Sequence, residues 1–278
     1  MEIIEQFLRS KTNNQEDCED SIFISDHFAA VIDGVTSKST KKYNNELPGK
    51  ACSLLLKQAL EELLPTSTAE QAVEFLTQKI HALYESMGLV EYLTINPVER
   101  AAASIIIYSK FHNEIWQVGD CQCLVDKTHY TNTKKIDVLA SNIRSFYIAS
   151  ELKLGKTLHS MQLNDTGRDY ILPILQRQVL FQNSFQKSEF TYGAIDGFNV
   201  PKDEIKVIKL SNPKAIVLAS DGYPMLFETL AESEAYLNKI IKEDPLCYKI
   251  YKSTKGLKQG YSSFDDRAYL KLRIKAAN

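Results

Sequence analysis

The sequence contains no uninterrupted run of about 18 apolar residues, the length that a membrane-spanning helix requires. Its first residues, Met1 to Glu5, lack the basic segment and apolar core of a secretory leader. Positive charge is not in excess either, because 33 Lys and Arg face 35 Asp and Glu, for a net charge of −2. These absences argue against a signal peptide, a membrane partner and a nucleic-acid partner, and we expect a cytoplasmic protein.

Cysteine and histidine are scarce and scattered. The five cysteines, an odd number, include no CxxC pair, so we expect reduced thiols. No His or Arg stands beside Cys121 to lower its pKa, which favours a packed strand residue over a nucleophile. The five histidines lack the spacing of metal ligands and stand at positions 27, 81, 112, 129 and 159. A zinc site is therefore not expected.

The chain has enough apolar material for a sizeable core, because 44% of its 278 residues are hydrophobic. It contains no internal repeat, linker or low-complexity tract, which favours a single domain over residues 1–278. Apolar residues at helical spacing predict helices over 48–64 and 68–88, and further helix over most of 136–183 and 226–242. Strands are predicted at 1–10, 21–24, 28–32, 101–108, 114–118, 121–125, 190–195, 205–210, 215–219 and 268–274.

The rest of the chain is organised around residues 27–34, His-Phe-Ala-Ala-Val-Ile-Asp-Gly. This run is apolar, rich in small and β-branched residues, and ends in Asp33 and Gly34, as a buried strand that enters a turn would. Residues 215–222 repeat the pattern and end in Asp221 and Gly222. A carboxylate at the end of an apolar strand is costly unless a positive charge meets it. The two acids therefore predict a metal ion between them.

Three further acids, Asp20, Asp120 and Asp265, lie at strand ends or in the loops beside them. A set of ligands that offers only oxygen suits Mg²⁺ or Mn²⁺ better than zinc. Pairs of such ions clamp phosphoryl oxygens and generate a hydroxide at neutral pH. Asp196 repeats the Asp-Gly dipeptide but is followed by Phe-Asn-Val-Pro, and there we predict a hairpin turn instead.

The order of these motifs resembles that of the metal-dependent protein phosphatase family, protein phosphatase 2C type. The family's opening Asn-Glu-Asp is similar to residues 18–21, and its strand with Asp-Gly to residues 31–34. Its Gly-Asp-Ser, Ser-Asp-Gly and terminal Asp-Asn/Asp-x-Thr are similar to residues 118–121, 219–222 and 265–268. Asp20 and Asp33 stand 13 positions apart, as in compact bacterial members. The five blocks together cover most of the chain.

The resemblance implies an α+β fold, a four-layer α-β-β-α sandwich in which helices flank two antiparallel sheets. It implies two Mn²⁺ or Mg²⁺ ions at one end of the sheets and a hydroxide, bridging them, that attacks phosphoserine or phosphothreonine in line. No covalent phosphoenzyme is then expected. The implied partners are a phosphoprotein substrate and a cognate Ser/Thr kinase.

Individual roles also follow from the resemblance. Asp33 would bridge both ions, and the carbonyl of Gly34 would bind one of them. Asp221 and Asp265 would hold the other ion, and Asp20 would orient the attacking water. Asp120 would help Asp221 to hold a weaker third ion.

The chain departs from the family pattern at several positions. Val35, Thr36 and Ser37 replace the residues that follow Asp-Gly in the family, Met225 stands where many members have an acid, and Ala268 stands in place of Thr. The upstream arginine that holds phosphate in eukaryotic members is missing, and Gln15 and Glu16 occupy its neighbourhood. The nearest upstream bases, Arg9 and Lys11, precede a polar loop and are not expected to reach the site. The phosphate would then be held mainly by the ions.

Selectivity for a protein substrate would come from surface beyond the phosphate. The divergent loop 35–45 carries Lys38, Lys41 and Lys42, and the polar segment 243–261 is a second candidate. The three lysines are equally consistent with an ordinary solvated loop.

Three functions remain open at this point. Retention of Asp33, Asp221 and Asp265 favours an active Ser/Thr protein phosphatase. The altered loop after Gly34 favours a non-catalytic or regulatory module that kept the fold. A metal-dependent hydrolase of small phosphate esters would need the same carboxylates. Mn²⁺-dependent release of phosphate from phosphopeptides, compared with small esters, separates these alternatives.

Overall fold

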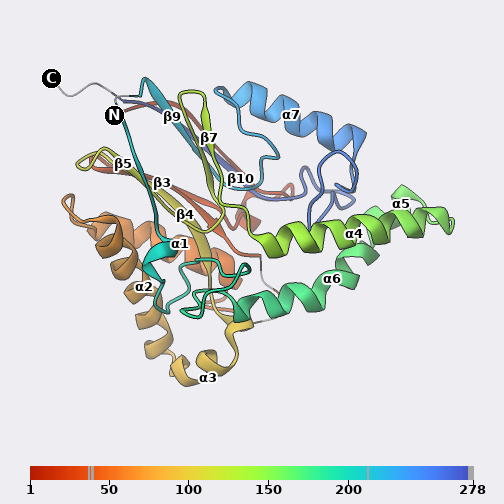
Figure 1. The fold of residues 1–278 in the computed structure, drawn as a ribbon, viewed down its shortest axis with the longest axis horizontal. Helices are drawn as coiled ribbons and strands as arrows, with labels where there is room; N and C mark the ends of the chain where they lie inside the picture. Colours follow the sequence, from red (N-terminus) through yellow and green to blue (C-terminus); the bar gives the residue numbers. More distant parts are fainter. Residues whose placement is uncertain (37, 39–40, 212, 275–278) are drawn as a thin grey trace.

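The computed structural model describes residues 1–36, 38, 41–211 and 213–274, and it contains two antiparallel sheets of five strands each (Figure 1). The first sheet has the order β1 (Glu2–Arg9), β10 (Arg267–Arg273), β9 (Ala215–Ala219), β6 (Gln122–Val125) and β7 (Thr128–Tyr130). The second has the order β2 (Ser21–Ile24), β3 (Phe28–Gly34), β4 (Ala103–Ser109), β5 (Glu114–Val118) and β8 (Lys206–Lys209). The α+β sandwich predicted from the sequence is thereby confirmed.

The inner faces of the two sheets pack together, and β3 shows why its sequence is continuously apolar. Ala29 and Val31 face the other sheet and belong to a cluster with Leu218 and Leu270. Ala30 and Ile32 point the opposite way, into a second cluster beneath the helices. Because successive side chains of a strand alternate between its faces, a strand buried on both faces has no polar face to show.

Helices cover the outer faces of both sheets. α1 (Pro48–Glu62) and α2 (Ala69–Ser86) pack on the second sheet, and α7 (Leu230–Glu243) packs on the first. Pro48 supplies the fixed φ of a first helical turn, and the Thr68 hydroxyl accepts the backbone N–H of Gln71 in a capping box. Both starts agree with the helices predicted from the sequence.

The remaining helices lie at one side of the sandwich or in its connections. α4 (Lys135–Lys153), α5 (Leu158–Leu163) and α6 (Thr166–Arg177) form a layer of their own, drawn in green in Figure 1. α3 (Val90–Ile95) follows α2, and four single-turn 3₁₀ helices occupy Gln15–Asp17, Pro97–Glu99, Gln178–Leu180 and Lys202–Glu204. No helix in the described ranges is long and apolar enough to cross a bilayer.

Two local predictions were wrong. Residues 190–195 form only isolated bridges, of Ile195 with Ala103 and of Tyr192 with Gln182, and not a strand. Asp196 therefore does not lie in the turn of a β-hairpin. Its carboxylate is buried and accepts hydrogen bonds from Arg100, Gln182 and Asn183. An Asp-Gly pair at a turn position gave no sign of these distant partners.

Candidate active site

The strand-end carboxylates meet at one end of the sandwich because two serines tie the strand ends together. Ser104 lies opposite Asp33 in the β3–β4 ladder. Its hydroxyl accepts the Cys121 N–H (2.8 Å) and donates to the Val118 carbonyl (3.2 Å), which fixes the β5–β6 turn and its Asp120 beside the end of β3. Ser220 likewise ties the end of β9 to the start of β10. Its N–H donates to the Ala268 carbonyl (3.1 Å), and its hydroxyl accepts the Ala268 N–H (2.9 Å).

Glycines let backbone segments approach closely at this end. A Cβ on Gly34 would lie 2.5 Å from the carbonyl oxygens of both Glu19 and Gly49. A Cβ on Gly222 would lie 2.0 Å from the carbonyl oxygen of Asp266. The glycine after each strand-end acid is therefore required by sterics, since it lets the loops that carry Glu19 and Asp266 reach the site.

Asp33, Asp120 and Asp221 form a compact carboxylate group, which we call the acidic triad. One oxygen from each lies within 4.8 Å of the others, and all three side chains are partly buried. The Asp221 N–H lies 3.4 Å from Asp33 Oδ2. Burial first, and then the neighbouring carboxylates, raise the pKa of Asp33 and of Asp221 well above the usual range. Among the described residues, neither Asp33 nor Asp221 forms an ion pair with a lysine or arginine.

The Glu19–Asp20 pair lies next to the triad and is almost fully buried. The two residues are 3% and 5% exposed, and Glu19 Oε1 and Asp20 Oδ2 have no hydrogen-bond partner among the described residues. Burial and the nearby charge of Asp266 raise the pKa of Asp20 well above its usual value. Buried oxygens without a donor are rare in folded proteins, and here they indicate a cation or ordered water between the chain's own groups.

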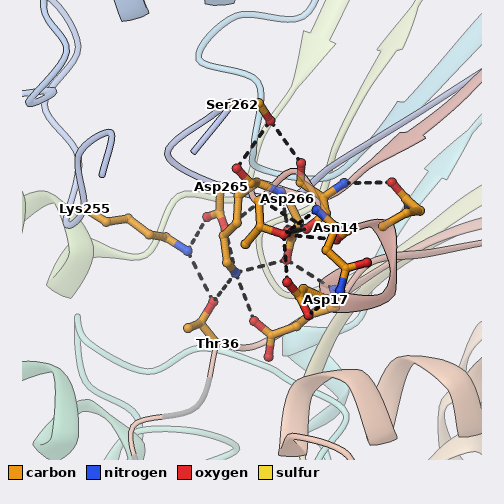
Figure 2. Close-up of polar contacts among 12 residues, drawn as sticks. Asn14, Asp17, Thr36, Lys255, Ser262, Asp265 and Asp266 are labelled. Atoms are coloured by element: carbon orange, nitrogen blue, oxygen red, sulfur yellow. Dashed lines mark hydrogen bonds and ion pairs between the residues drawn. The ribbon is translucent and has the colours of Figure 1, made fainter. Parts of the chain in front are cut away.

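Asp265 is placed differently from the triad. Lys255 Nζ contacts Asp265 Oδ2, as Figure 2 shows, and Lys11 Nζ lies 3.7 Å from Oδ1. Burial by itself would raise the pKa of Asp265, but Lys255 and Lys11 outweigh it and hold that pKa below the usual value. Among the described residues, no oxygen of Asp265 belongs to a group of three possible metal ligands.

Lys11 does reach the site, contrary to the sequence-based expectation. Its Nζ lies 3.0 Å from Glu19 Oε2, 3.0 Å from Asp266 Oδ2 and 3.3 Å from Thr36 Oγ1. Its backbone N–H donates to Asp266 Oδ1 (2.7 Å). This bond holds the start of the polar loop that follows Lys11 against the site. The ammonium group is thus enclosed by carboxylates, as a bound cation would be.

Asp120 has a lysine of its own. Lys134 Nζ lies 2.7 Å from Asp120 Oδ2 and 3.9 Å from Asp137 Oδ2. Burial opposes ionisation of Asp120, but Lys134 prevails and lowers its pKa. The acidic triad therefore carries three carboxylates and one ammonium partner.

A cavity of about 100 Å³ is lined by the triad itself, by the carboxylates of Asp137 and Asp265, and by five cationic side chains. These cations come from separate parts of the chain and are Lys38, Arg100, Lys134, Arg168 and Lys255. Arg168, on α6, donates from Nη1 to the Thr254 carbonyl (3.0 Å). Burial, with Lys134 and Arg168 nearby, lowers the pKa of Lys38 to about 8. Arg168 thus lines the site, although the sequence analysis predicted no arginine there.

Other residues singled out in the sequence contribute no oxygen to the triad. Cys121 is fully buried, and burial raises the pKa of its thiol well above the usual range, in agreement with a packing role. Lys41 lies 3.8 Å from Glu99 Oε2, and Lys42 lines a separate cavity that also includes Lys11. Ser37, in the loop predicted to recognise substrate, lies outside the described residues.

Comparison with known proteins gives structural matches only. No family model and no curated protein matches the sequence. The serine/threonine phosphatase PstP/Ppp of Mycobacterium tuberculosis is 14% identical with a TM-score of 0.46, covering 98% of this chain and 99% of that one. The serine/threonine phosphatase Stp1 from Staphylococcus aureus is 13% identical with a TM-score of 0.46, and the match covers 99% of this chain and 98% of that one. RsbX in complex with magnesium is 12% identical with a TM-score of 0.46, and the match covers 97% of this chain and 94% of that one. Identities and scores this low establish no activity for this chain.

Proposed function

We propose that this chain is a metal-dependent phosphatase that hydrolyses phosphoserine and phosphothreonine in proteins. The observation that carries the proposal is the acidic triad in a cavity that lysines and arginines also line, beside buried carboxylate oxygens that have no hydrogen-bond partner among the described residues. Negative charge binds a divalent ion, and positive charge next to it receives a phosphate. A metal-dependent phosphatase needs carboxylates for the ion and cationic side chains for the phosphate in the same site.

The residues present fit a hard divalent ion such as Mn²⁺ or Mg²⁺. The triad offers only carboxylate oxygen, and in the described part of the chain no lysine forms an ion pair with Asp33 or Asp221. The Gly34 carbonyl is proposed to join them. When bound, such an ion polarises phosphoryl oxygens and lowers the pKa of water.

The chain's own groups would position the two reactants. We assign Asp20 Oδ2, which is buried and without a partner, to accept a proton from the attacking water and to aim it at phosphorus. Arg168 and Lys38 line the cavity and would hold the phosphoryl oxygens. A guanidinium can donate two parallel hydrogen bonds to phosphate, so Arg168 would take the place of the arginine missing from residues 15–16. Attack by water in line leaves no phosphoenzyme.

One observation favours a second candidate, a non-catalytic phosphatase-like module. Lysines already pair with Asp120, Asp265 and Asp266, so part of the charge that would attract ions is neutralised by the chain itself. A module of this kind would bind a phosphoprotein without turnover. A cytoplasmic location, a single domain over residues 1–278 and a partner kinase remain predictions in either case.

The test is release of phosphate from a phosphoserine peptide with Mn²⁺, with Mg²⁺ and with chelator. We expect turnover with either ion, none with chelator, and background rates for Asp33→Ala and Asp221→Ala. Asp120→Ala should be milder, because Lys134 already offsets the charge of Asp120. Asp26→Asn, in the exposed β2–β3 turn, is the matched control and should leave the rate unchanged.

Each outcome assigns the chain to one candidate. Turnover in excess chelator would refute the metal mechanism. Tight peptide binding without turnover would support the non-catalytic module. Faster turnover of a small ester than of the peptide would indicate a hydrolase of small phosphate esters.

A further inference from the structure

The site divides into two halves that differ in how their charge is balanced. In one half, Lys11 and Lys255 neutralise a set of carboxylates that comprises Glu19, Asp265 and Asp266. In the other half, Lys134 is the lysine that pairs with the acidic triad among the described residues, and it also lies 3.9 Å from Asp137 Oδ2. Among the ion-paired groups, three carboxylates against two ammonium groups leave one negative charge in the lysine half. Three against one leave two in the triad, the charge that a single divalent ion balances; the buried carboxylate of Asp20, beside the triad, is counted in neither half.

The contacts of Lys11 are those expected of a resident cation. Its side chain is only 15% exposed, and its Nζ lies 3.0 Å from an oxygen of Glu19 and 3.0 Å from an oxygen of Asp266. Its backbone N–H also donates to Asp266, so the residue is held at both ends. Thr36 Oγ1 adds a neutral oxygen, shared with Lys255. A buried charge is tolerated only with such complete pairing.

We infer that the ammonium groups of Lys11 and Lys255 take the place of a second divalent ion at Asp265, so that the site binds one ion, at Asp33, Asp120 and Asp221. The inference rests on the proposed function and deepens it, because the family pattern implies two ions. Asp265 becomes a positioning residue that orders the two lysines. Lys255 also lines the cavity, so the same ammonium can face the phosphate of a substrate.

A direct test counts the ions without any assay of turnover. Mn²⁺ is added to the metal-free full-length chain, bound ion per chain is measured by equilibrium dialysis, and its electron paramagnetic resonance spectrum is recorded. We expect one bound ion per wild-type chain, with the resolved hyperfine pattern of an isolated Mn²⁺. Lys255→Met and the double variant Lys11→Met/Lys255→Met free Asp265, and we expect each to bind a second ion that is exchange-coupled to the first.

Controls keep the inference open to refutation. Lys258→Met removes an exposed lysine from the same segment and should still bind one ion. Two coupled ions on the wild-type chain would overturn the inference, and if phosphopeptide turnover is observed as well, the proposed function survives. A stoichiometry of one in the folded Lys11→Met/Lys255→Met chain, from which both lysines at Asp265 have been removed, would also overturn it. A wild-type chain that binds no Mn²⁺ would refute both proposals.

Discussion

Removing the charge of Asp33 should stabilise the metal-free protein and abolish its stabilisation by Mn²⁺. In the Asp33→Asn variant the shape is kept and one carboxylate of the triad is lost. Two like charges 4.8 Å apart repel by about 3.5 kcal/mol at an effective dielectric constant of about 20. In the metal-free wild type, burial and neighbouring acids raise the pKa of Asp33, so partial protonation of Asp33 already reduces this repulsion. We therefore expect a net gain of about 2 kcal/mol.

Thermal unfolding at neutral pH, with chelator and with Mn²⁺, measures both effects. A gain of about 2 kcal/mol corresponds to a Tm roughly 4–8 °C higher for a chain of this size. Mn²⁺ at 100 times its Kd should stabilise the wild type by about 2.7 kcal/mol and the variant by almost nothing. Asp26→Asn, an exposed acid outside the site, should behave like the wild type in both conditions.

The pH dependence provides an internal check on the sign. A carboxyl whose pKa is higher in the folded than in the unfolded protein lowers the free energy of unfolding at pH values above its folded pKa. This loss of stability shrinks as the pH falls from the folded pKa to the unfolded pKa of about 3.9, and it is absent below that value. The advantage of Asp33→Asn in chelator should therefore be largest at neutral pH and vanish below about pH 4. A variant that is less stable than the wild type in chelator, or that keeps the full Mn²⁺ shift, would refute the assignment of Asp33 to the triad.

Two further predictions separate folding from chemistry. Asp196→Ala leaves the half-buried Arg100 without its carboxylate partner and should lower the free energy of unfolding in urea by about 3–5 kcal/mol. The kcat of the folded protein should be unchanged, and a loss of kcat at full stability would place Asp196 in the site. Gly222→Ala would set a Cβ 2.0 Å from the Asp266 carbonyl oxygen and should remove the Mn²⁺ shift in Tm. Gly88→Ala is its control: a Cβ there meets nothing within 4 Å, so its φ of +64° should cost about 1–2 kcal/mol and leave the Mn²⁺ shift intact.

Local patterns predicted most of the strands and the acids at their ends, whereas the two-sheet sandwich was predicted from the family resemblance. The apolar run of β3 has no polar face, so a strand buried on both sides was predictable from residues 28–32 alone. The glycines after Asp33 and Asp221 are also evident in the sequence. The sequence does not show why glycine is needed there, which is that the backbone of distant loops lies in close contact with both positions. The same local approach assigned Asp196 to a turn, because its partners at 100, 182 and 183 leave no trace beside it.

The charge balance of the site was decided by tertiary structure alone. Lys11, Lys134, Lys255 and Arg168 stand in polar loops or at helix ends, where a lysine or arginine is ordinarily solvated and carries no periodic signal. Only the packing of α4 and α6 beside the sheets, and of the loop before β10 against Lys11, brings these cations among the carboxylates. Strand ends visible in the sequence deliver Asp33, Asp120 and Asp221 to one point, but Asp265, which was predicted to join them, pairs with lysines instead. Some of the cations come from nearby loops, as Lys134 beside Asp120 and Lys255 beside Asp265, and one comes from the far end of the chain, as Lys11 beside Asp266. No periodic pattern in the sequence encodes such loop contacts.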